Sequence, residues 1–148
     1  QYIALTEDEE LAIYYDLMYA ERLITIDREY ERALQICNRL LDHSELPEYM
    51  LGFIYITKGV ALYYQNELSA ALYWLEKATL SRVIRHPIDL SSFYVKDVYR
   101  ALIFKKTGRV EKARETIEKA RENMESLPWT PYHDLAEKAY TEIVQTER

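Results

Sequence analysis

The stretch from Gly59 to Ala78 constrains the fold of this chain more than any other. It predicts the end of one helix, a tight turn and a second helix, with small residues at Gly59, Ala71 and Ala78. Small side chains at such positions let two antiparallel helices approach closely. The same spacing returns further along the chain, where alanines stand at Ala101, Ala113 and Ala120. Because a helix-pair pattern that returns regularly is typical of an α-solenoid, the sequence predicts an all-α fold of stacked helix pairs.

The composition agrees with a single, mostly helical domain over residues 1–148. Only three Gly and four Pro leave few turns, and 49% apolar residues suffice for a core. The net charge of −6 argues against a nucleic-acid surface, and no apolar run approaches the length of a membrane span. One cysteine, Cys37, excludes an internal disulfide and favours a reducing compartment. We therefore expect a cytoplasmic protein with neither nucleic acid nor membrane as a direct partner. Since the chain begins with Gln, we expect a processed protein or a piece of a longer one.

Start and stop signals predict seven helices. Thr6 and Glu9 form a capping box, and Asp27 and Asn66 are the expected N-caps of the second and fourth helices. On the first helix, helical spacing is kept by Leu11, Tyr14, Tyr15, Met18 and Leu23. The expected ranges are about 7–26, 27–42, 47–65, 66–84, 89–106, 109–125 and 131–146. They make three antiparallel pairs and one closing helix.

The second pair resembles a tetratricopeptide repeat. That motif has an aromatic residue, Leu-Gly and Tyr on its first helix, then Ala, an aromatic residue and Ala on its second. The matching residues here are Tyr55, Lys58, Gly59, Leu62, Ala71, Leu75 and Ala78. The third pair matches through Arg100, Ala101, Phe104, Ala113, Ile117 and Ala120, and the first through Ala20 or Glu21, Ala33, Cys37 and Leu40. The resemblance covers about residues 12–125 and implies a right-handed superhelix of about three such pairs.

The length of the repeats extends this resemblance. The intervals from Ala33 to Ala71 and from Ala71 to Ala113 both exceed the usual repeat of about 34 residues, and the second interval is the longer. Longer pairs of this kind are similar to the sensor halves of bacterial transcription regulators, including Gram-positive regulators that bind short signalling peptides. The resemblance implies a protein- or peptide-binding module, the ligand-sensing part of a bacterial cytoplasmic regulator. The alternative is an assembly module that joins the subunits of a larger complex and senses no ligand.

In such repeats the first helix of each pair lines the concave face. The resemblance places eight candidate ligand-binding residues there: Tyr15, Tyr19, Arg22, Phe53, Thr57, Tyr64, Tyr99 and Lys106. An aromatic groove with a few cations suits an extended or helical peptide, because rings supply contact area and cations meet carboxylates. The alternative is that these aromatic residues pack against neighbouring helices as core.

The sequence offers no catalytic constellation. His43, His86 and His133 each lie near a helix boundary, at spacings that form no metal-binding pair, and Cys37 falls at a core position. We therefore expect no enzyme, no metal site and no cofactor.

The last helix has two possible roles. Its apolar residues, with Trp129 before it, can close the end of the solenoid, whose last apolar face would otherwise be exposed to water. If they do not, the same face is expected to form a homodimer contact.

Overall fold

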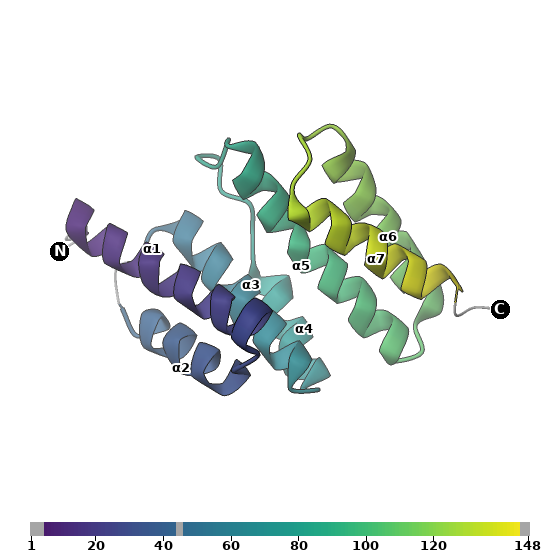
Figure 1. Ribbon diagram of the computed structural model, residues 1–148, viewed down its shortest axis with the longest axis horizontal. Helices are drawn as coiled ribbons and strands as arrows, with labels where there is room; N and C mark the ends of the chain where they lie inside the picture. Colours follow the sequence, from purple (N-terminus) through teal and green to yellow (C-terminus); the bar gives the residue numbers. More distant parts are fainter. Residues whose placement is uncertain (1–4, 44–45, 146–148) are drawn as a thin grey trace. The chain divides into compact units, whose positions relative to one another are not determined.

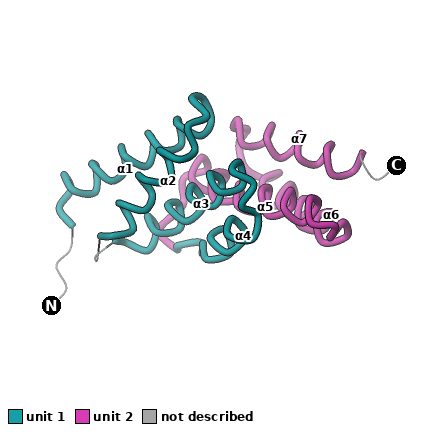
Figure 2. Tube along the Cα trace, turned by 90° about the horizontal axis from the view of Figure 1, so that it is seen from below, with its two compact units in different colours: residues 1–81 teal, residues 82–148 magenta. Residues whose placement is uncertain are grey.

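The computed structural model describes residues 5–43 and 46–145 (Figure 1). Within these ranges the chain forms helices joined by turns and contains no strand, so the prediction of an all-α fold is confirmed. The sequence predicts one domain over residues 1–148. The structure divides them into two compact units, residues 1–81 and 82–148 (Figure 2).

The first unit contains two helical hairpins. Its elements are α1 (Glu7–Arg22), the π-helical segment η1 (Leu23–Asp27), α2 (Tyr30–Leu41), α3 (Glu48–Tyr64) and α4 (Leu68–Lys77). Helix α1 pairs with α2 and α3 with α4, while α3 also packs against α1 and α2. The core side chains that are almost fully buried include Ala20, Leu23, Cys37, Leu40, Ile54 and Leu75.

The second unit contains one hairpin and a closing helix. Its elements are α5 (Pro87–Lys106), α6 (Val110–Glu125) and α7 (Pro131–Gln145). Helix α7 packs against both α5 and α6 and buries Ala136, Ala139 and Ile143. The last helix therefore covers the apolar face of its own unit, as the closing role requires.

The three hairpins close with turns of the same kind, the first of which is one residue longer than the other two because of η1. A residue with left-handed backbone ends the first helix of each: Arg28 (φ 56°), Asn66 (φ 63°) and Gly108 (φ 82°). The next residue donates its backbone N–H to the last turn of that helix: Glu29 to the Leu23 carbonyl (2.8 Å), Glu67 to Leu62 (2.9 Å) and Arg109 to Phe104 (2.8 Å). These bonds satisfy carbonyls that a helix end leaves open. The turns recur at the same spacings as Ala33, Ala71 and Ala113.

The second hairpin closes tightly, as its small residues predict. A Cβ added to Gly59 would lie 2.6 Å from Cγ of Leu75 and 3.1 Å from the carbonyl oxygen of Ala71. Ala71 is fully buried, and so is Ala101, which takes the place of Gly59 in the next hairpin. Only a glycine lets α3 and α4 approach this closely at that point.

Two predicted caps are wrong. Asp27 ends η1 and Asn66 forms the left-handed turn, so Glu29 and Glu67 occupy the N-cap positions of α2 and α4. The sequence rule favours short polar side chains at caps, but in both hairpins the cap is the residue after the left-handed one, two positions beyond Asp27 and one beyond Asn66. The Thr6 capping box is confirmed, because the Glu9 N–H donates to the Thr6 hydroxyl (3.1 Å) and the Thr6 N–H to the Glu9 carboxylate (3.3 Å).

Two further helix bounds differ from the prediction. Helix α4 ends at Lys77 instead of about residue 84, because the backbone becomes extended at Ala78. Two of the residues that follow, Thr79 and Ser81, also have low helix propensity. Helix α5 begins at Pro87, two residues early, because the His86 ring accepts the Ile88 N–H at 3.2 Å and caps it. The predicted end of the last helix, residue 146, lies outside the described residues.

Candidate functional site

The predicted ligand-binding residues of the first unit lie on two helices. Tyr15, Tyr19 and Arg22 are exposed on α1; the Tyr19 hydroxyl accepts from Arg32 at 2.7 Å, and Arg22 lies 3.9 Å from Asp27. On α3, three predicted residues differ sharply in exposure. Phe53 is half-buried, Thr57 is only 4% exposed and donates its hydroxyl to the Phe53 carbonyl, and Tyr64 is exposed. The Tyr64 ring stacks on Tyr30 of α2 at 5.2 Å.

The other two predicted residues belong to the second unit, on α5. Tyr99 is 5% exposed and Lys106 is exposed near the end of the helix. Buried side chains such as Thr57 and Tyr99 have little surface to offer a partner. The exposed members of the predicted set are therefore the ones that can form a contact, and three of them share α1.

Helix α1 carries the densest group of exposed apolar side chains in the described chain. These are Leu11 (48% exposed), Tyr14 (53%), Tyr15 (61%), Met18 (48%) and Tyr19 (42%). We call them, together with Arg22, the α1 surface. Each of the other described α-helices has at most one large hydrophobic side chain exposed to this degree. Aromatic residues, Met and Arg are enriched in protein interfaces, and a contiguous apolar patch on a helix is a common mark of one.

The α1 surface arises because α1 has two apolar stripes. Ile13, Leu17 and Ala20 form the buried stripe. Positions 11, 15, 18 and 22 form a second stripe at helical spacing on the opposite side. The helical spacing of Leu11, Tyr14, Tyr15 and Met18 is visible in the sequence, and so is the buried stripe, but spacing alone does not show that α1 has two apolar faces of which one stays exposed.

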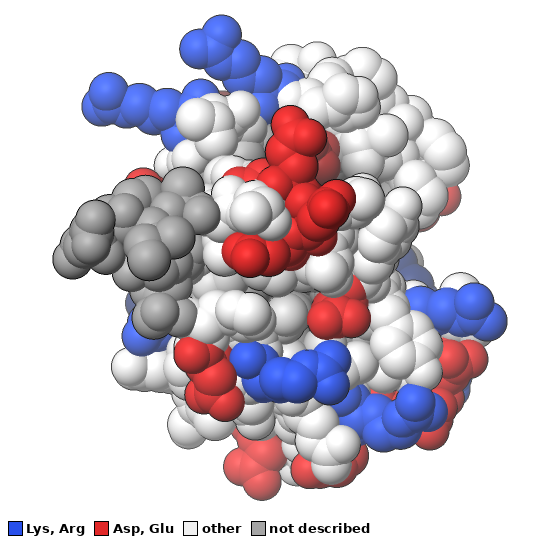
Figure 3. All heavy atoms as spheres, turned by 90° about the vertical axis from the view of Figure 1, so that its left-hand side faces the viewer, with Lys and Arg blue, Asp and Glu red and all other residues white. Residues whose placement is uncertain are grey.

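Charge is distributed unevenly along α1. Its first turn holds Glu7, Asp8, Glu9 and Glu10, and its last turn holds Arg22. Figure 3 looks at the side of the molecule on which α1 begins and shows a cluster of acidic side chains above its centre, with acidic and basic side chains intermixed below it. The acidic residues also stabilise the positive end of the helix dipole. Along α1, the exposed apolar side chains thus lie between the acidic first turn and the basic Arg22 of the last turn.

A second aromatic group lies on α3 and α4. The Lys58 ammonium lies 3.9 Å from the centre of the Trp74 ring and donates to Asn38 at 2.6 Å. The Lys77 ammonium lies within 5.3 Å of the rings of Tyr55, Tyr73 and Trp74. Burial lowers the pKa of Lys58. These lysines and aromatic rings contact one another across the two helices. We therefore interpret this group as packing between α3 and α4 and not as a binding site.

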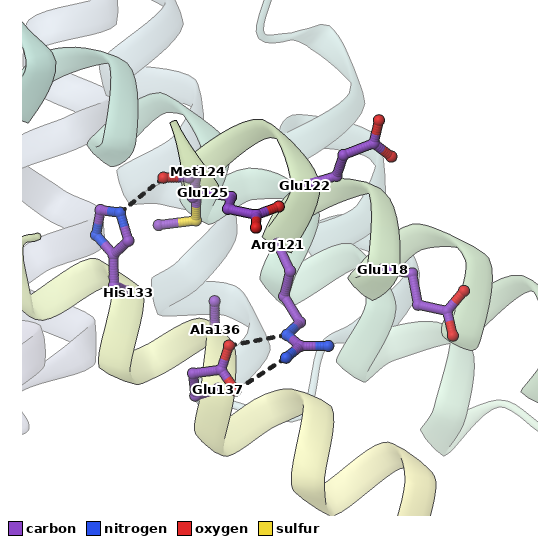
Figure 4. A pocket seen from close by; sticks show the side chains of 8 residues that line it. All are labelled: Glu118, Arg121, Glu122, Met124, Glu125, His133, Ala136 and Glu137. Atoms are coloured by element: carbon purple, nitrogen blue, oxygen red, sulfur yellow. Dashed lines mark hydrogen bonds and ion pairs between the residues drawn. The ribbon is translucent and has the colours of Figure 1, made fainter. Parts of the chain in front are cut away.

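A cavity of about 360 Å³ lies between α6 and α7 (Figure 4). Four glutamates line it, together with Met124, Ala136, Arg121 and His133. The last two side chains already form bonds within the protein. Arg121 forms a two-bond ion pair with Glu137 (2.8 and 3.2 Å) and lies over the Tyr140 ring at 3.8 Å. The hydrogen bond to Glu137 raises the pKa of Arg121.

The second engaged group of this cavity is His133. Its Nδ1 accepts the Thr130 N–H at 3.0 Å, so Nε2 carries the proton and donates to the Met124 carbonyl at 2.9 Å. His133 therefore joins the start of α7 to the end of α6. The polar groups of the cavity hold two helices together, which makes it a packing feature of the second unit.

The described residues offer no metal site, since no three of their His, Cys, Asp and Glu side chains converge on a point where an ion could bind. Burial raises the pKa of the Cys37 thiol to about 12, which keeps it protonated and unreactive. Among the described helices, none combines the length and the apolar character needed to cross a bilayer.

Comparison with known proteins gives no relative: no family model, curated protein or solved structure matches this chain.

Proposed function

We propose that this chain is a protein- or peptide-binding helical module, and that its first unit binds through the α1 surface. The observation that carries the proposal is the concentration of Leu11, Tyr14, Tyr15, Met18 and Tyr19 on one exposed face. An exposed helix face of this kind excludes water best when another helix or an extended segment covers it.

The shared turn of the three hairpins supports the same proposal. Its repetition, in step with the small residues, agrees with the resemblance to tetratricopeptide repeats, whose helix pairs commonly bind proteins and peptides. We extend the proposal to the class of regulator that the resemblance suggests, a bacterial cytoplasmic protein that senses a ligand through this module.

The proposal is tested with a displayed library of random peptides panned against the purified chain. We expect enriched peptides that bind the wild-type chain at least about tenfold more tightly than a Tyr15→Ala/Met18→Ala variant, since truncating anchors near the centre of an interface commonly costs more than about 1 kcal/mol. Tyr73→Ala on α4 is the matched control, because Tyr73 is as exposed as Tyr15 but lies outside the α1 surface.

Circular dichroism and thermal melting must show that all three proteins are folded. A library that yields no binder, or binders that ignore the α1 changes, would contradict the proposal.

A further inference from the structure

We propose that the partner of the α1 surface is a second copy of this chain, bound with the two α1 helices antiparallel. This inference rests on the proposed function and names the occupant of its surface. Three observations on α1 carry it: the equivalence of α1 and α3, the symmetry of the stripe, and its charge pattern.

Helices α1 and α3 occupy equivalent places in their hairpins, because α3 leads into the left-handed turn at Asn66 and α1 leads through η1 into the left-handed turn at Arg28, which the π-helical segment makes one residue longer. The carbonyls that accept in those turns belong to Leu23 and Leu62, and pairing these two residues aligns the helices. Ala20 then matches Gly59: Gly59 faces Leu75 and Ala71 of α4, and Ala20 is fully buried. The alignment therefore identifies which face of α1 corresponds to which face of α3.

The α1 surface corresponds to a face that α3 buries. The residues of α3 that match Leu11, Tyr15, Met18 and Arg22 are Met50 (7% exposed), Ile54 (0%), Thr57 (4%) and Ala61 (0%). At helical spacing they lie on the side of α3 opposite Gly59, which faces α4, and α3 also packs against α1 and α2. The same stripe is thus buried in α3, whereas in α1 Leu11, Tyr15 and Met18 are between 48% and 61% exposed. Its shape suits another α-helix.

The stripe is complementary to itself when two copies run antiparallel. Asp8 and Arg22 each lie seven residues from Tyr15, one on either side, and seven residues keep a side chain on the same helix face. If the two Tyr15 side chains meet near a twofold axis, Asp8 of each copy faces Arg22 of the other. Leu11, Met18 and the flanking tyrosines fill the space between. Such an interface is isologous and closes at two copies.

A parallel pairing would instead place the acidic first turns, Glu7 to Glu10, against each other. The charge pattern therefore favours the antiparallel arrangement of two α1 helices. The contact is about 24 Å long, from 16 residues at about 1.5 Å each, so we expect a transient dimer.

The closing helix offers no comparable surface, since the outward residues of α7 are mostly polar: Asp134, Glu137, Lys138, Thr141, Glu142 and Gln145.

The test is sedimentation of the full chain over a concentration series up to about 1 mM, the range in which interfaces of low area associate. We expect a monomer–dimer equilibrium in the wild type. Tyr15→Glu should abolish the dimer, because it places two carboxylates at the axis, and Tyr73→Glu should leave it unchanged. Circular dichroism of each variant reports whether α1 is retained.

Charge reversal tests the antiparallel register. Asp8→Arg or Arg22→Glu alone should weaken dimerisation about tenfold, because each replaces two attractive contacts by two repulsive ones. Mixing the two variants, or combining them in one chain, should restore the wild-type constant. In a parallel pair, position 8 of one copy would face position 8 of the other, and position 22 would face position 22. A single reversal would then leave equal charges opposite each other, so it would not weaken the dimer in this way.

A wild-type chain that remains monomeric overturns the inference, as does a dimer that survives Tyr15→Glu. The two proposals fail separately. A monomer that still selects α1-dependent peptides refutes only the second copy, whereas a chain with neither property refutes the proposed function as well. If both proposals are correct, selected peptides should shift the dimer to monomer, because the peptide and the second copy compete for the α1 surface.

Discussion

At the scale of the residue, Gly59 and Ala71 set the distance between α3 and α4. The space for a Cβ at Gly59 is filled by Leu75, which is fully buried, and by the carbonyl of Ala71. A close-packed contact of this kind has no room for extra methylene groups.

Ala71→Leu should therefore destabilise the chain by roughly 1–3 kcal/mol, through overpacking of this contact. Urea denaturation measures the change in the free energy of unfolding. Ala12→Leu is the matched control, since Ala12 is exposed on α1. Equal midpoints for the two variants would show that Ala71 tolerates a larger side chain and that the hairpins are looser than the structure indicates.

Two of the three left-handed positions, Gly108 and Arg28, should respond in opposite ways when glycine is removed or introduced. Gly108→Ala should lower stability by about 1–2 kcal/mol, because an L-residue is strained at φ 82°. Arg28→Gly should be neutral or stabilising, since it relieves a similar strain at φ 56°. The comparison uses urea midpoints, and a stabilising Gly108→Ala would disprove the assignment of the shared turn.

Cys37 gives the chain a predicted dependence on high pH. Burial, the largest cause, together with Glu21 raises the pKa of the folded thiol from 9.0 to about 12, while Lys58 opposes the shift. The stabilisation is thus complete below the unfolded pKa and is lost as pH rises through about 9 towards 12. The urea midpoint should fall more between pH 8 and pH 10.5 in the wild type than in Cys37→Ala; equal falls would mean that the thiol is not buried.

At the scale of the element, the sequence was sufficient to predict the number and order of the seven helices and the close packing at Gly59 and Ala71. These features depend on local periodicity and on small residues, which a sequence displays directly. The starts of α2 and α4 could not be predicted, because the left-handed geometry of Arg28 and Asn66 depends on how the preceding helix closes.

The candidate site was predicted only in part. Tyr15, Tyr19 and Arg22 are exposed on α1, but the burial of Thr57 and Tyr99 depends on tertiary packing that spacing alone does not reveal. A helix with two apolar stripes, such as α1, leaves open which of them faces the core until its partner helices are placed.

Helix α7 carries a prediction at this scale. Deletion of residues 129–148 should expose the surfaces of α5 and α6 that Ala136, Ala139 and Ile143 cover. We expect a lower melting temperature or aggregation, because a solenoid end without a polar cap exposes apolar surface. A truncated chain with unchanged melting temperature and solubility would show that α7 does not close its unit.

At the scale of the whole molecule, two compact helical units share one chain, and the largest group of exposed apolar side chains lies on the first unit. Surface of this kind promotes association unless charge opposes it. The net charge of −6 gives the molecule a general repulsion between copies, which salt screens. The acidic and basic ends of α1 make an antiparallel approach the favourable exception.

The most direct test of the account is a series of amide nuclear magnetic resonance spectra of the full chain, recorded at increasing concentration and then with a selected peptide. We predict that shift changes concentrate at residues 7–22 in both series and vanish in Tyr15→Glu, because both partners cover the α1 surface. Spectra that do not change on α1, or that change mainly on α4 or α7, would contradict the claim that α1 is the binding surface of this chain.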